Sequence, residues 1–418
     1  MLIIPKFSFG VGDRFGRQGS AQLRAFEKIH AAGIDVAPVW NKSNREHVFI
    51  GTKPDSVRTE ADAAVRAAGW KTPYFVDADH IGLKTVEDYI TASDFFTLDV
   101  ADFVGKPDAD AKTFADRQAG PSGKVRVDLP GGLPPLEAGK SDIEAAADKF
   151  LGAVKEAGRI YRFIEKAKGA GNFVTEVSMD ETDVAQSPTE LYFILAMIAE
   201  EGIPAQTIAP KFTGRFNKGV DYVGDIAGFD REFESDVAVA IVAAKTFGLP
   251  TGLKLSVHSG SDKFSIYPGI RKACRKFDAG VHVKTAGTTW VEEIAALASV
   301  GGEGLALAKE IYGEASAHID EMTAAYAAVI DIDRGKLPTP AEIADWSAER
   351  LCATFRHDPR NPEYNPNARQ FIHVAFKVAA KLGRRYLDLL DKFAKPVGEA
   401  VTENIYQRHL VPLFKSDA

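Results

Sequence analysis

Residues 73–80, PYFVDADH, begin as an apolar run and end in two carboxylates and an imidazole. Short runs rich in β-branched and aromatic residues are typical of buried strands of a parallel sheet. Seven more such runs occur, at residues 2–9, 34–40, 95–101, 173–178, 205–212, 253–258 and 281–286. Stretches with helical periodicity separate them, which predicts consecutive βα units. Eight units in sequence favour a closed (β/α)8 TIM-type barrel over an open doubly wound sheet.

The chain has 418 residues, and its pattern changes after the eighth predicted unit. We predict a barrel domain over 1–302 and an α-helical extension over 303–418 that packs on the barrel. Capping boxes predict helix starts at Ser187, Thr289 and Thr339, each with a glutamate three residues later. These three signals mark helix starts and carry no chemistry.

The segment 105–140 departs from this alternation because it is rich in Gly, Pro and Asp. We interpret it as a loop that follows the fourth strand. Loops at that end of a barrel shape substrate pockets, so the segment is expected to lie near the site.

Composition narrows the class of protein. The net charge is -7, and the 51 basic and 58 acidic residues are interspersed, which argues against a nucleic-acid partner. Two cysteines exclude a disulfide scaffold and a structural cysteine-zinc module. No run of about 18 apolar residues and no signal-peptide pattern occurs, so we expect a cytoplasmic protein without a membrane partner.

Three of the nine histidines, His80, His258 and His282, come at corresponding ends of predicted strands. A lone histidine in such a place is more often a hydrogen-bonded core or surface residue than a ligand. Three of them suggest a shared divalent cation, because the strands of a barrel converge at that end. Imidazoles with a carboxylate suit Zn, Ni, Mn or Fe and do not suit Mg or Ca.

Carboxylates accompany these histidines. Asp79 is interpreted as a general base, since a nearby cation stabilises its ionised form. Asp77 lies on the same strand face and is equally well a turn or helix-cap carboxylate. Glu176 lies inside an apolar strand, where an unpaired charge is costly, so we expect it to face the barrel mouth, a ligand or a cationic partner. The roles of general acid and metal ligand are both open. Asp180, which follows, is equally well a loop residue.

Basic and hydroxyl side chains follow several of the same strands. Each basic group alone is more often a structural ion-pair partner, whereas together they would hold an anionic substrate such as an acid sugar. Arg14 in particular has the fork geometry that clamps a carboxylate. The predicted substrate-binding residues are Arg14, Lys211, Ser259, Lys263 and Lys284.

Six segments resemble the tagaturonate/fructuronate epimerase family. They are FSFGVGDRFG (7–16), VDADHI (76–81), TEVSMDET (175–182), SVHSGSDKFSIYP (256–268), HVKTAGTT (282–289) and RQFIHV (369–374). Members are metal-dependent enzymes that invert one hydroxyl-bearing carbon of a keto-uronate. The resemblance implies that Asp79 is the proton acceptor and Glu176 the proton donor. It also implies that His80, His258 and His282 bind the metal.

The expected reaction interconverts D-tagaturonate and D-fructuronate at the carbon β to the ketone. The carbonyl does not acidify that hydrogen, so we expect retro-aldol cleavage and recombination rather than enolisation. The alternatives are an epimerase of neutral ketohexoses (tagatose and fructose), a metal-dependent aldolase or isomerase on the same barrel, and a non-catalytic sugar-binding barrel. The sequence leaves open whether the chain forms a homo-oligomer.

Overall fold

A computed structural model describes residues 1–180, 182–285 and 287–415. Ala286, at the end of the eighth predicted strand, lies outside the described residues, as do Glu181 and the last three residues of the predicted extension. Within the described part, no helix is both long and apolar enough to span a membrane.

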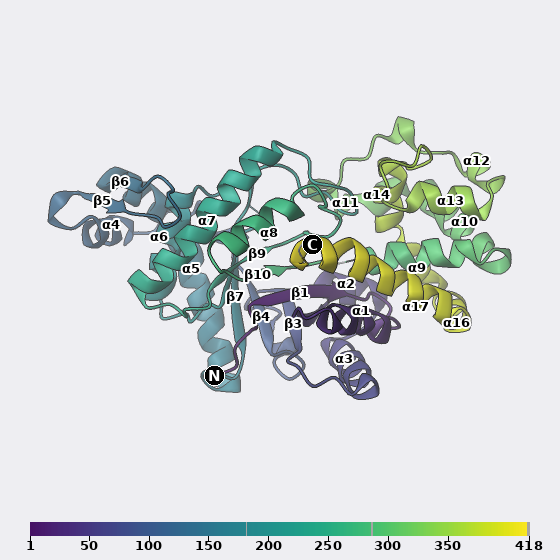
Figure 1. Ribbon diagram of the computed structural model, residues 1–418, viewed down its shortest axis with the longest axis horizontal. Helices are drawn as coiled ribbons and strands as arrows, with labels where there is room; N and C mark the ends of the chain where they lie inside the picture. Colours follow the sequence, from purple (N-terminus) through teal and green to yellow (C-terminus); the bar gives the residue numbers. More distant parts are fainter. Residues whose placement is uncertain (181, 286, 416–418) are drawn as a thin grey trace.

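Eight parallel strands close into a barrel, as the sequence predicted (Figure 1). The strands follow one another around the barrel in chain order, and β10 pairs with β1 to close it. Their bounds are β1 Phe7–Gly12, β2 Ala37–Asn41, β3 Phe75–Ile81, β4 Phe95–Asp99, β7 Val174–Ser178, β8 Thr207–Ala209, β9 Lys254–Val257 and β10 Val281–Val283. Because all eight run in one direction, their carboxyl ends meet at one mouth.

Helices surround the barrel. They are α1 Gly19–Ala31, α2 Asn44–Ile50, α3 Pro54–Ala68, α5 Lys140–Lys168, α6 Pro188–Glu200, α7 Ile226–Phe247, α8 Tyr267–Lys276 and α9 Thr288–Ser299. The capping box predicted at Ser187 is confirmed. The capping box predicted at Thr289 is wrong. The helix α9 begins at Thr288, and its N-cap is Gly287. The Thr289 hydroxyl instead accepts a hydrogen bond from Gln22.

The segment 105–140 is not a simple loop. It contains a helix, α4 (Ala111–Ala119), and a two-stranded antiparallel sheet of β5 (Lys124–Val127) and β6 (Leu136–Gly139). These elements pack on α5 and α6, away from the barrel mouth (Figure 1). Glycine and proline are frequent around the two short strands. The sequence pattern therefore predicted a loop and missed the hairpin.

The described part of the predicted extension is helical. Its α-helices are α10 Gly302–Ala317, α11 Ile319–Ala324, α12 Pro340–Ala344, α13 Ala348–Phe355, α14 Pro366–Val374, α15 Phe376–Leu382, α16 Arg384–Lys392, α17 Ala394–Glu403 and α18 Val411–Phe414, with a π-helix at Asn404–Leu410. The capping box at Thr339 is confirmed. A boundary between residues 302 and 303 remains a prediction.

The last helices of the extension complete the helical layer of the barrel. The helix α17 and the π-helix pack on α1, and α18 packs on α8 (Figure 1). Val401, Ile405 and Leu410 belong to the same hydrophobic core as the strands. The earlier helices form a second core with α9 around Trp290 and Phe371. The extension therefore stabilises the barrel as well as flanking it.

The barrel interior changes character along its axis. Val39, Phe75, Phe95 and Val174 form an apolar layer at the amino-terminal end. Polar side chains occupy the middle, where Thr97, Glu176, Thr207 and Lys254 lie on neighbouring strands in register. Because buried charges are costly without partners, this polar layer is the first structural sign of a site.

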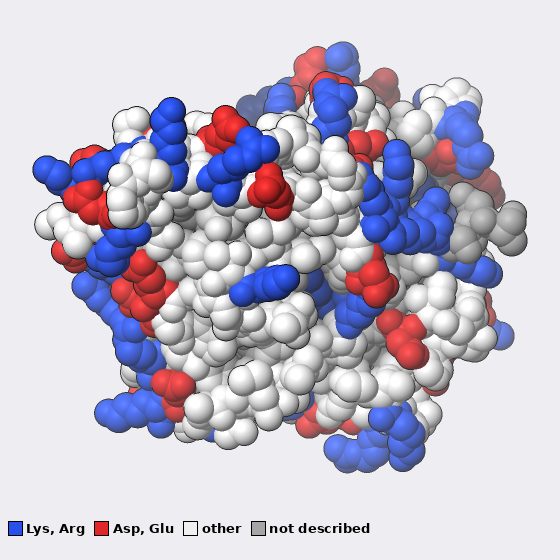
Figure 2. All heavy atoms as spheres, turned by 60° about the vertical axis from the view of Figure 1, so that its left-hand side comes forward, with Lys and Arg blue, Asp and Glu red and all other residues white. Residues whose placement is uncertain are grey.

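The surface carries both signs of charge. On the face seen in Figure 2, Lys and Arg side chains lie among Asp and Glu side chains around a broad area with few charges. The described residues of this face therefore form no continuous basic surface of the kind that a nucleic acid requires.

Candidate functional site

A cavity of about 660 Å³ lies at the barrel mouth. Side chains at or beyond the carboxyl end of every barrel strand line it, and residues 325–329 of the extension complete the wall. The volume falls in the range of small-molecule sites. The segment 105–140 contributes no residue to the described lining, so its predicted role in shaping the pocket is wrong.

Two histidines and one carboxylate converge at the cavity wall. His80, Asp180 and His258 each offer a ligand atom, and these atoms lie within 4.8 Å of one another. The Asp180 Oδ1 atom is 3.2 Å from His80 Nε2 and 3.0 Å from His258 Nδ1. Among the described residues, the buried His258 Nδ1 has no partner with hydrogen-bond geometry, although Asp180 is close. An unpartnered ring nitrogen that faces a carboxylate oxygen fits a cation, and this donor set suits Zn, Mn, Fe or Ni.

The other nitrogen of each ring contacts a second carboxylate. His80 Nδ1 lies 2.7 Å from Asp79 Oδ1, and His258 Nε2 lies 2.7 Å from Glu176 Oε1. Metal-binding histidines usually donate their remaining N–H to such a group, which fixes the tautomer and the ring orientation. We refer to His80, Asp180 and His258 with these two carboxylates as the mouth cluster.

An irregularity in β3 brings His80 to the mouth. The register with β4 shifts between Ala78 and Ile81, and His80 has a φ of 52°. A regular strand would turn His80 to the face opposite Asp79. The left-handed backbone at His80 therefore lets both side chains reach the site. Such strain in a residue other than glycine is often found at functional sites.

Lys284 joins the mouth cluster to the polar layer below it. Its ammonium lies 2.6 Å from Asp77, 2.7 Å from Asp79 and 2.6 Å from the Thr97 hydroxyl. Burial alone would raise the pKa of Asp79, but Lys284 and His80 hold it well below its usual range. For Asp77, the effect of burial on the pKa is larger than the opposing effect of Lys284, so the pKa is raised to about 6. Of these two carboxylates, Asp79 is therefore the one that stays ionised, and it lines the cavity.

The charge state of the histidines follows from the same carboxylates. Burial alone would lower the pKa of His80, but Asp79 and Asp180 hold it well above its ordinary value. Asp180 and Glu176 likewise raise the pKa of His258 against the effect of burial. The mouth cluster thus favours positive charge at the point where the rings converge.

His282, the third predicted ligand, is not part of this group, and its role as a ligand stays a prediction. It is fully buried in β10, where its Nδ1 lies 2.9 Å from the Ser8 hydroxyl and its ring packs on Phe95. Burial lowers its pKa to about 3. The strand that carries His282 points this side chain into the middle layer of the barrel, below the mouth. Asp180 takes the third place in the group instead.

Lys263 is not a substrate-binding residue in this geometry. It is fully buried, and its ammonium donates to the backbone carbonyls of Asn217, Val220 and Ser261 at 2.8, 2.7 and 3.0 Å. All three donors are therefore used within the protein. The sequence could not show this, because two of the three acceptors belong to residues 217–220, more than 40 positions away in the chain.

The other predicted substrate-binding residues, Arg14, Lys211, Ser259 and Lys284, line the cavity. Arg14 is engaged by Glu46 at 2.8 Å and by the His373 carbonyl at 2.9 Å, so its charge is already compensated. The Lys211 ammonium makes no hydrogen bond or ion pair with another described residue. Lys211 is therefore the better anchor for an anion.

Sequence reasoning missed several cavity residues. The sequence left open whether Asp180 is a loop residue, although its place two residues beyond the end of β7 is a usual one for a barrel ligand. Arg45, Arg215 and Lys218 also line the cavity and add to its basic character. Tyr326 comes from the extension, and no local pattern marks it as part of a site.

The fold and the site define a (β/α)8-barrel protein with a candidate metal centre and a cavity lined by basic and acidic side chains at the carboxyl ends of its strands. The model of the tagaturonate epimerase family matches residues 3–123 and 133–408, so the chain belongs to this family. A tagaturonate/fructuronate epimerase of Thermotoga maritima is 29% identical over 96% of this chain and 80% of its own length.

Solved structures agree on the fold. The glycerol-bound fructuronate-tagaturonate epimerase of Cohnella laeviribosi superposes with a TM-score of 0.80 at 24% identity, over 99% of this chain and 82% of that one. Its native form gives a TM-score of 0.78 at 23% identity with the same coverage. At these identities the likeness establishes the architecture, including the helical extension.

Proposed function

We propose that this chain is a metal-dependent epimerase that interconverts D-tagaturonate and D-fructuronate, an activity of hexuronate metabolism in the cytoplasm. The observation that carries the proposal is the mouth cluster, where His80, Asp180 and His258 converge beside Asp79 at the wall of a basic cavity. Family membership supplies the reaction class, and the cavity volume suits a six-carbon sugar acid.

His80, Asp180 and His258 are the residues proposed to hold the metal. A divalent cation bound there would act as a Lewis acid on the ketone of the sugar. Asp79 and Glu176 orient the two imidazoles from behind. The family resemblance implies that His282 is a further ligand, and this role stays a proposal. Its Nδ1 contacts Ser8 and its ring contacts Phe95, while its buried Nε2 has no hydrogen-bond partner among the described residues.

Asp79 is proposed to accept the proton of the hydroxyl β to the ketone. It lines the cavity, and its contacts with Lys284 and His80 keep it ionised. Loss of that proton drives cleavage of the bond between the α and β carbons, whose electron pair passes to the carbonyl oxygen. The resulting aldehyde rotates, the carbon-carbon bond forms again from its other face, and a proton returns to the new alkoxide.

Glu176 is the proton donor that the family resemblance implies. It is fully buried, does not line the cavity, and accepts hydrogen bonds from His258 and Thr97. Burial alone would raise its pKa, but His258 and Lys284 hold it well below its usual range. A carboxylate that stays ionised behind a histidine is suited to orienting it, so we propose this role for Glu176 ahead of proton donation.

Lys211 is proposed to bind the carboxylate that distinguishes a uronate from a neutral ketohexose. Its ammonium faces the cavity without a described partner, whereas Arg14 is paired with Glu46. Lys218, Arg45 and Arg215 supply a basic surround. Hydrogen bonds to a charged group contribute about 1.5–3 kcal/mol, enough to separate an acid from a neutral sugar.

The decisive experiment is product analysis. The purified protein is stripped with a chelator, reloaded with Mn, Zn, Ni or Fe, and incubated with tagaturonate or fructuronate, and the products are resolved by NMR. We expect each substrate to yield the other only in the reloaded samples. Activity that survives complete removal of the metal, or the absence of either product in every reloaded sample, would overturn the proposal.

The bond that breaks is tested separately. Recovery of a trapped triose-sized aldehyde during turnover supports retro-aldol cleavage. Incorporation of solvent deuterium at the inverted carbon contradicts it. Tagatose and fructose in the same assay measure whether the enzyme requires the carboxylate.

A further inference from the structure

The segment 258–263, which follows β9, has an unusual backbone. Ser259 and Asp262 have positive φ angles of 50° and 62°. Residues with a side chain adopt this conformation only when their surroundings impose it. His258 begins the segment and Ser259 lines the cavity. Whatever holds the segment in this shape therefore determines where the His258 ring lies.

The buried carboxylate of Asp262 anchors the segment through contacts with three side chains. It lies 3.0 Å from Arg369 Nη2 and 3.2 Å from His357 Nδ1, and the Thr288 hydroxyl donates to it at 3.3 Å. Arg369 and Asp262 are both fully buried. A buried ion pair offsets its desolvation only when further hydrogen bonds satisfy both groups, as they do here. Two of these three partners belong to the extension.

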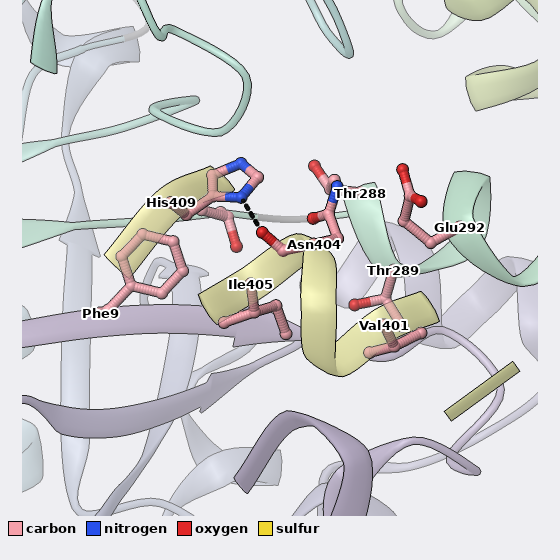
Figure 3. Close-up of a pocket in the computed structure, with 9 residues that line it drawn as sticks. Phe9, Thr288, Thr289, Glu292, Val401, Asn404, Ile405 and His409 are labelled. Atoms are coloured by element: carbon pink, nitrogen blue, oxygen red, sulfur yellow. Dashed lines mark hydrogen bonds between the residues drawn. The ribbon is translucent and has the colours of Figure 1, made fainter. Parts of the chain in front are cut away.

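The backbone of Asp262 is recognised as well. Its N–H donates to His409 Nε2 at 3.1 Å. Nδ1 of the same ring donates to the Asn404 carbonyl at 3.0 Å within the π-helix, as the dashed line in Figure 3 shows. That bond leaves Nε2 as an acceptor, so the C-terminal π-helix selects the strained conformation of Asp262. We refer to Asp262, Arg369, His357 and His409 as the Asp262 cluster.

The same arginine holds a second cavity segment. Arg369 Nε donates to the Gly219 carbonyl and Nη1 to the Phe355 carbonyl, both at 2.5 Å. Gly219 follows Asn217 and Lys218, which line the cavity, and the Lys218 ammonium donates to the Ser259 hydroxyl at 2.9 Å. One guanidinium thus connects the extension to both segments that flank this side of the site.

We propose that Asp262 and Arg369 are positioning residues through which the C-terminal extension sets the place of His258 in the candidate metal centre and of Ser259 and Lys218 in the substrate cavity. The inference rests on the proposed function, because it concerns the same metal centre and the same substrate. Neither residue lines the cavity, so each acts through the segments that it holds.

The test uses the full-length enzyme and Asp262→Asn, which keeps the side-chain volume and removes the charge that Arg369 pairs. Mn²⁺ affinity is measured by calorimetry, and kcat and KM for tagaturonate are measured at saturating Mn²⁺. We expect Mn²⁺ to bind about 10- to 100-fold more weakly, the usual effect of losing support behind a ligand. KM should rise several-fold, and kcat should change less. Arg369→Lys should give an intermediate loss, because a single ammonium nitrogen cannot reach the three acceptors that the guanidinium contacts through three separate nitrogens.

Thr402→Val is the matched control. Its hydroxyl donates to the Ala21 carbonyl, so it also joins the extension to the barrel, but at α1. We expect it to lower thermal stability while Mn²⁺ affinity and KM stay at the wild-type values. A merely structural role for Asp262 would give the same result as this control.

The outcomes separate the two proposals. Wild-type protein that neither binds Mn²⁺ nor epimerises tagaturonate overturns the proposed function, and the positioning proposal with it. Active wild-type protein with an unchanged, folded Asp262→Asn variant overturns the positioning proposal alone. Should Asp262→Asn not fold, His357→Phe replaces it, because it removes one partner of the carboxylate and retains the ring contacts with Tyr364 and Phe264. An unchanged Mn²⁺ affinity in that variant likewise contradicts the proposal.

Discussion

The mouth cluster and the Asp262 cluster contain the same kinds of side chain and lie at the two ends of one six-residue segment, yet they are built differently. In the mouth cluster, His80 Nε2 and His258 Nδ1 lie 3.2 and 3.0 Å from a single oxygen of Asp180. Among the described residues, His258 Nδ1 has no partner with hydrogen-bond geometry. In the Asp262 cluster, the carboxylate and the backbone N–H both have partners within 3.3 Å.

The pKa values of the histidines also differ between the two clusters. Burial alone would lower the pKa of His80, but Asp79 and Asp180 raise it well above its ordinary value. Burial instead lowers the pKa of His409 to about 4, so this ring stays neutral. The first cluster favours an added positive charge beside a 660 Å³ cavity, whereas the second is satisfied within the protein. Residue types alone therefore do not distinguish a ligand site from a structural one; unsatisfied groups at a cavity wall do.

Asp79→Asn should have the largest effect on turnover. We expect kcat to fall about 100- to 10,000-fold, the range for a positioned general base, while Mn²⁺ still binds. Asp180→Asn should instead lose most Mn²⁺ affinity, because it removes a proposed ligand. Steady-state kinetics and calorimetry on both variants check this contrast. Near-normal turnover by Asp79→Asn would show that Asp79 is not the general base.

Glu176→Gln tests whether Glu176 orients His258 or donates a proton. If Glu176 orients His258, Mn²⁺ affinity should fall about 10- to 100-fold, and much of the lost turnover should return at saturating Mn²⁺. If Glu176 is the proton donor, kcat should fall about 100-fold or more at any Mn²⁺ concentration. Titration of activity against free Mn²⁺ separates the two results.

Lys211→Met should affect the acid substrate selectively. We expect kcat/KM for tagaturonate to fall about 10- to 100-fold, as a lost hydrogen bond to a charged group predicts, with no change for a neutral ketohexose that turns over. Lys166→Met, at an exposed position of α5, is the control and should match wild type on both sugars. An equal loss on the acid and the neutral sugar would contradict the carboxylate assignment.

The smallest expected effect concerns acid stability. Burial alone would raise the pKa of Asp262, but Arg369 and His357 hold it well below its usual value in the folded protein. A carboxyl whose folded pKa is depressed stabilises the fold above its unfolded pKa of about 3.9, and that contribution is lost as the pH falls below it. The free energy of unfolding of metal-free protein, measured in urea at pH 6 and pH 3, should therefore decrease less in Asp262→Asn than in wild type. Equal decreases would show that Asp262 is not held ionised.

Much of this molecule follows from local sequence. All eight barrel strands overlap the predicted apolar runs, because burial on both faces demands a continuous apolar or β-branched stretch, although β1 begins five residues later than predicted. Ser187 and Thr339 begin helices because a hydroxyl and a glutamate three residues later satisfy the first backbone N–H groups. The position of His80 and His258 near strand ends was also readable, since parallel strands in a barrel must end together.

The tertiary structure alone decided which side chains meet. It placed Asp180 beside His80 and His258, and His282 beside Ser8, because a strand's pleat sends one side chain into the middle of the barrel while a loop residue returns to the mouth. It turned Lys263 inward and gave the Lys211 ammonium no partner among the described residues, because hydrogen-bond partners are supplied by segments far away in the chain. The strained backbone at His80, Ser259 and Asp262 is likewise invisible in sequence, because only distant contacts such as those from Arg369 and His409 can stabilise it.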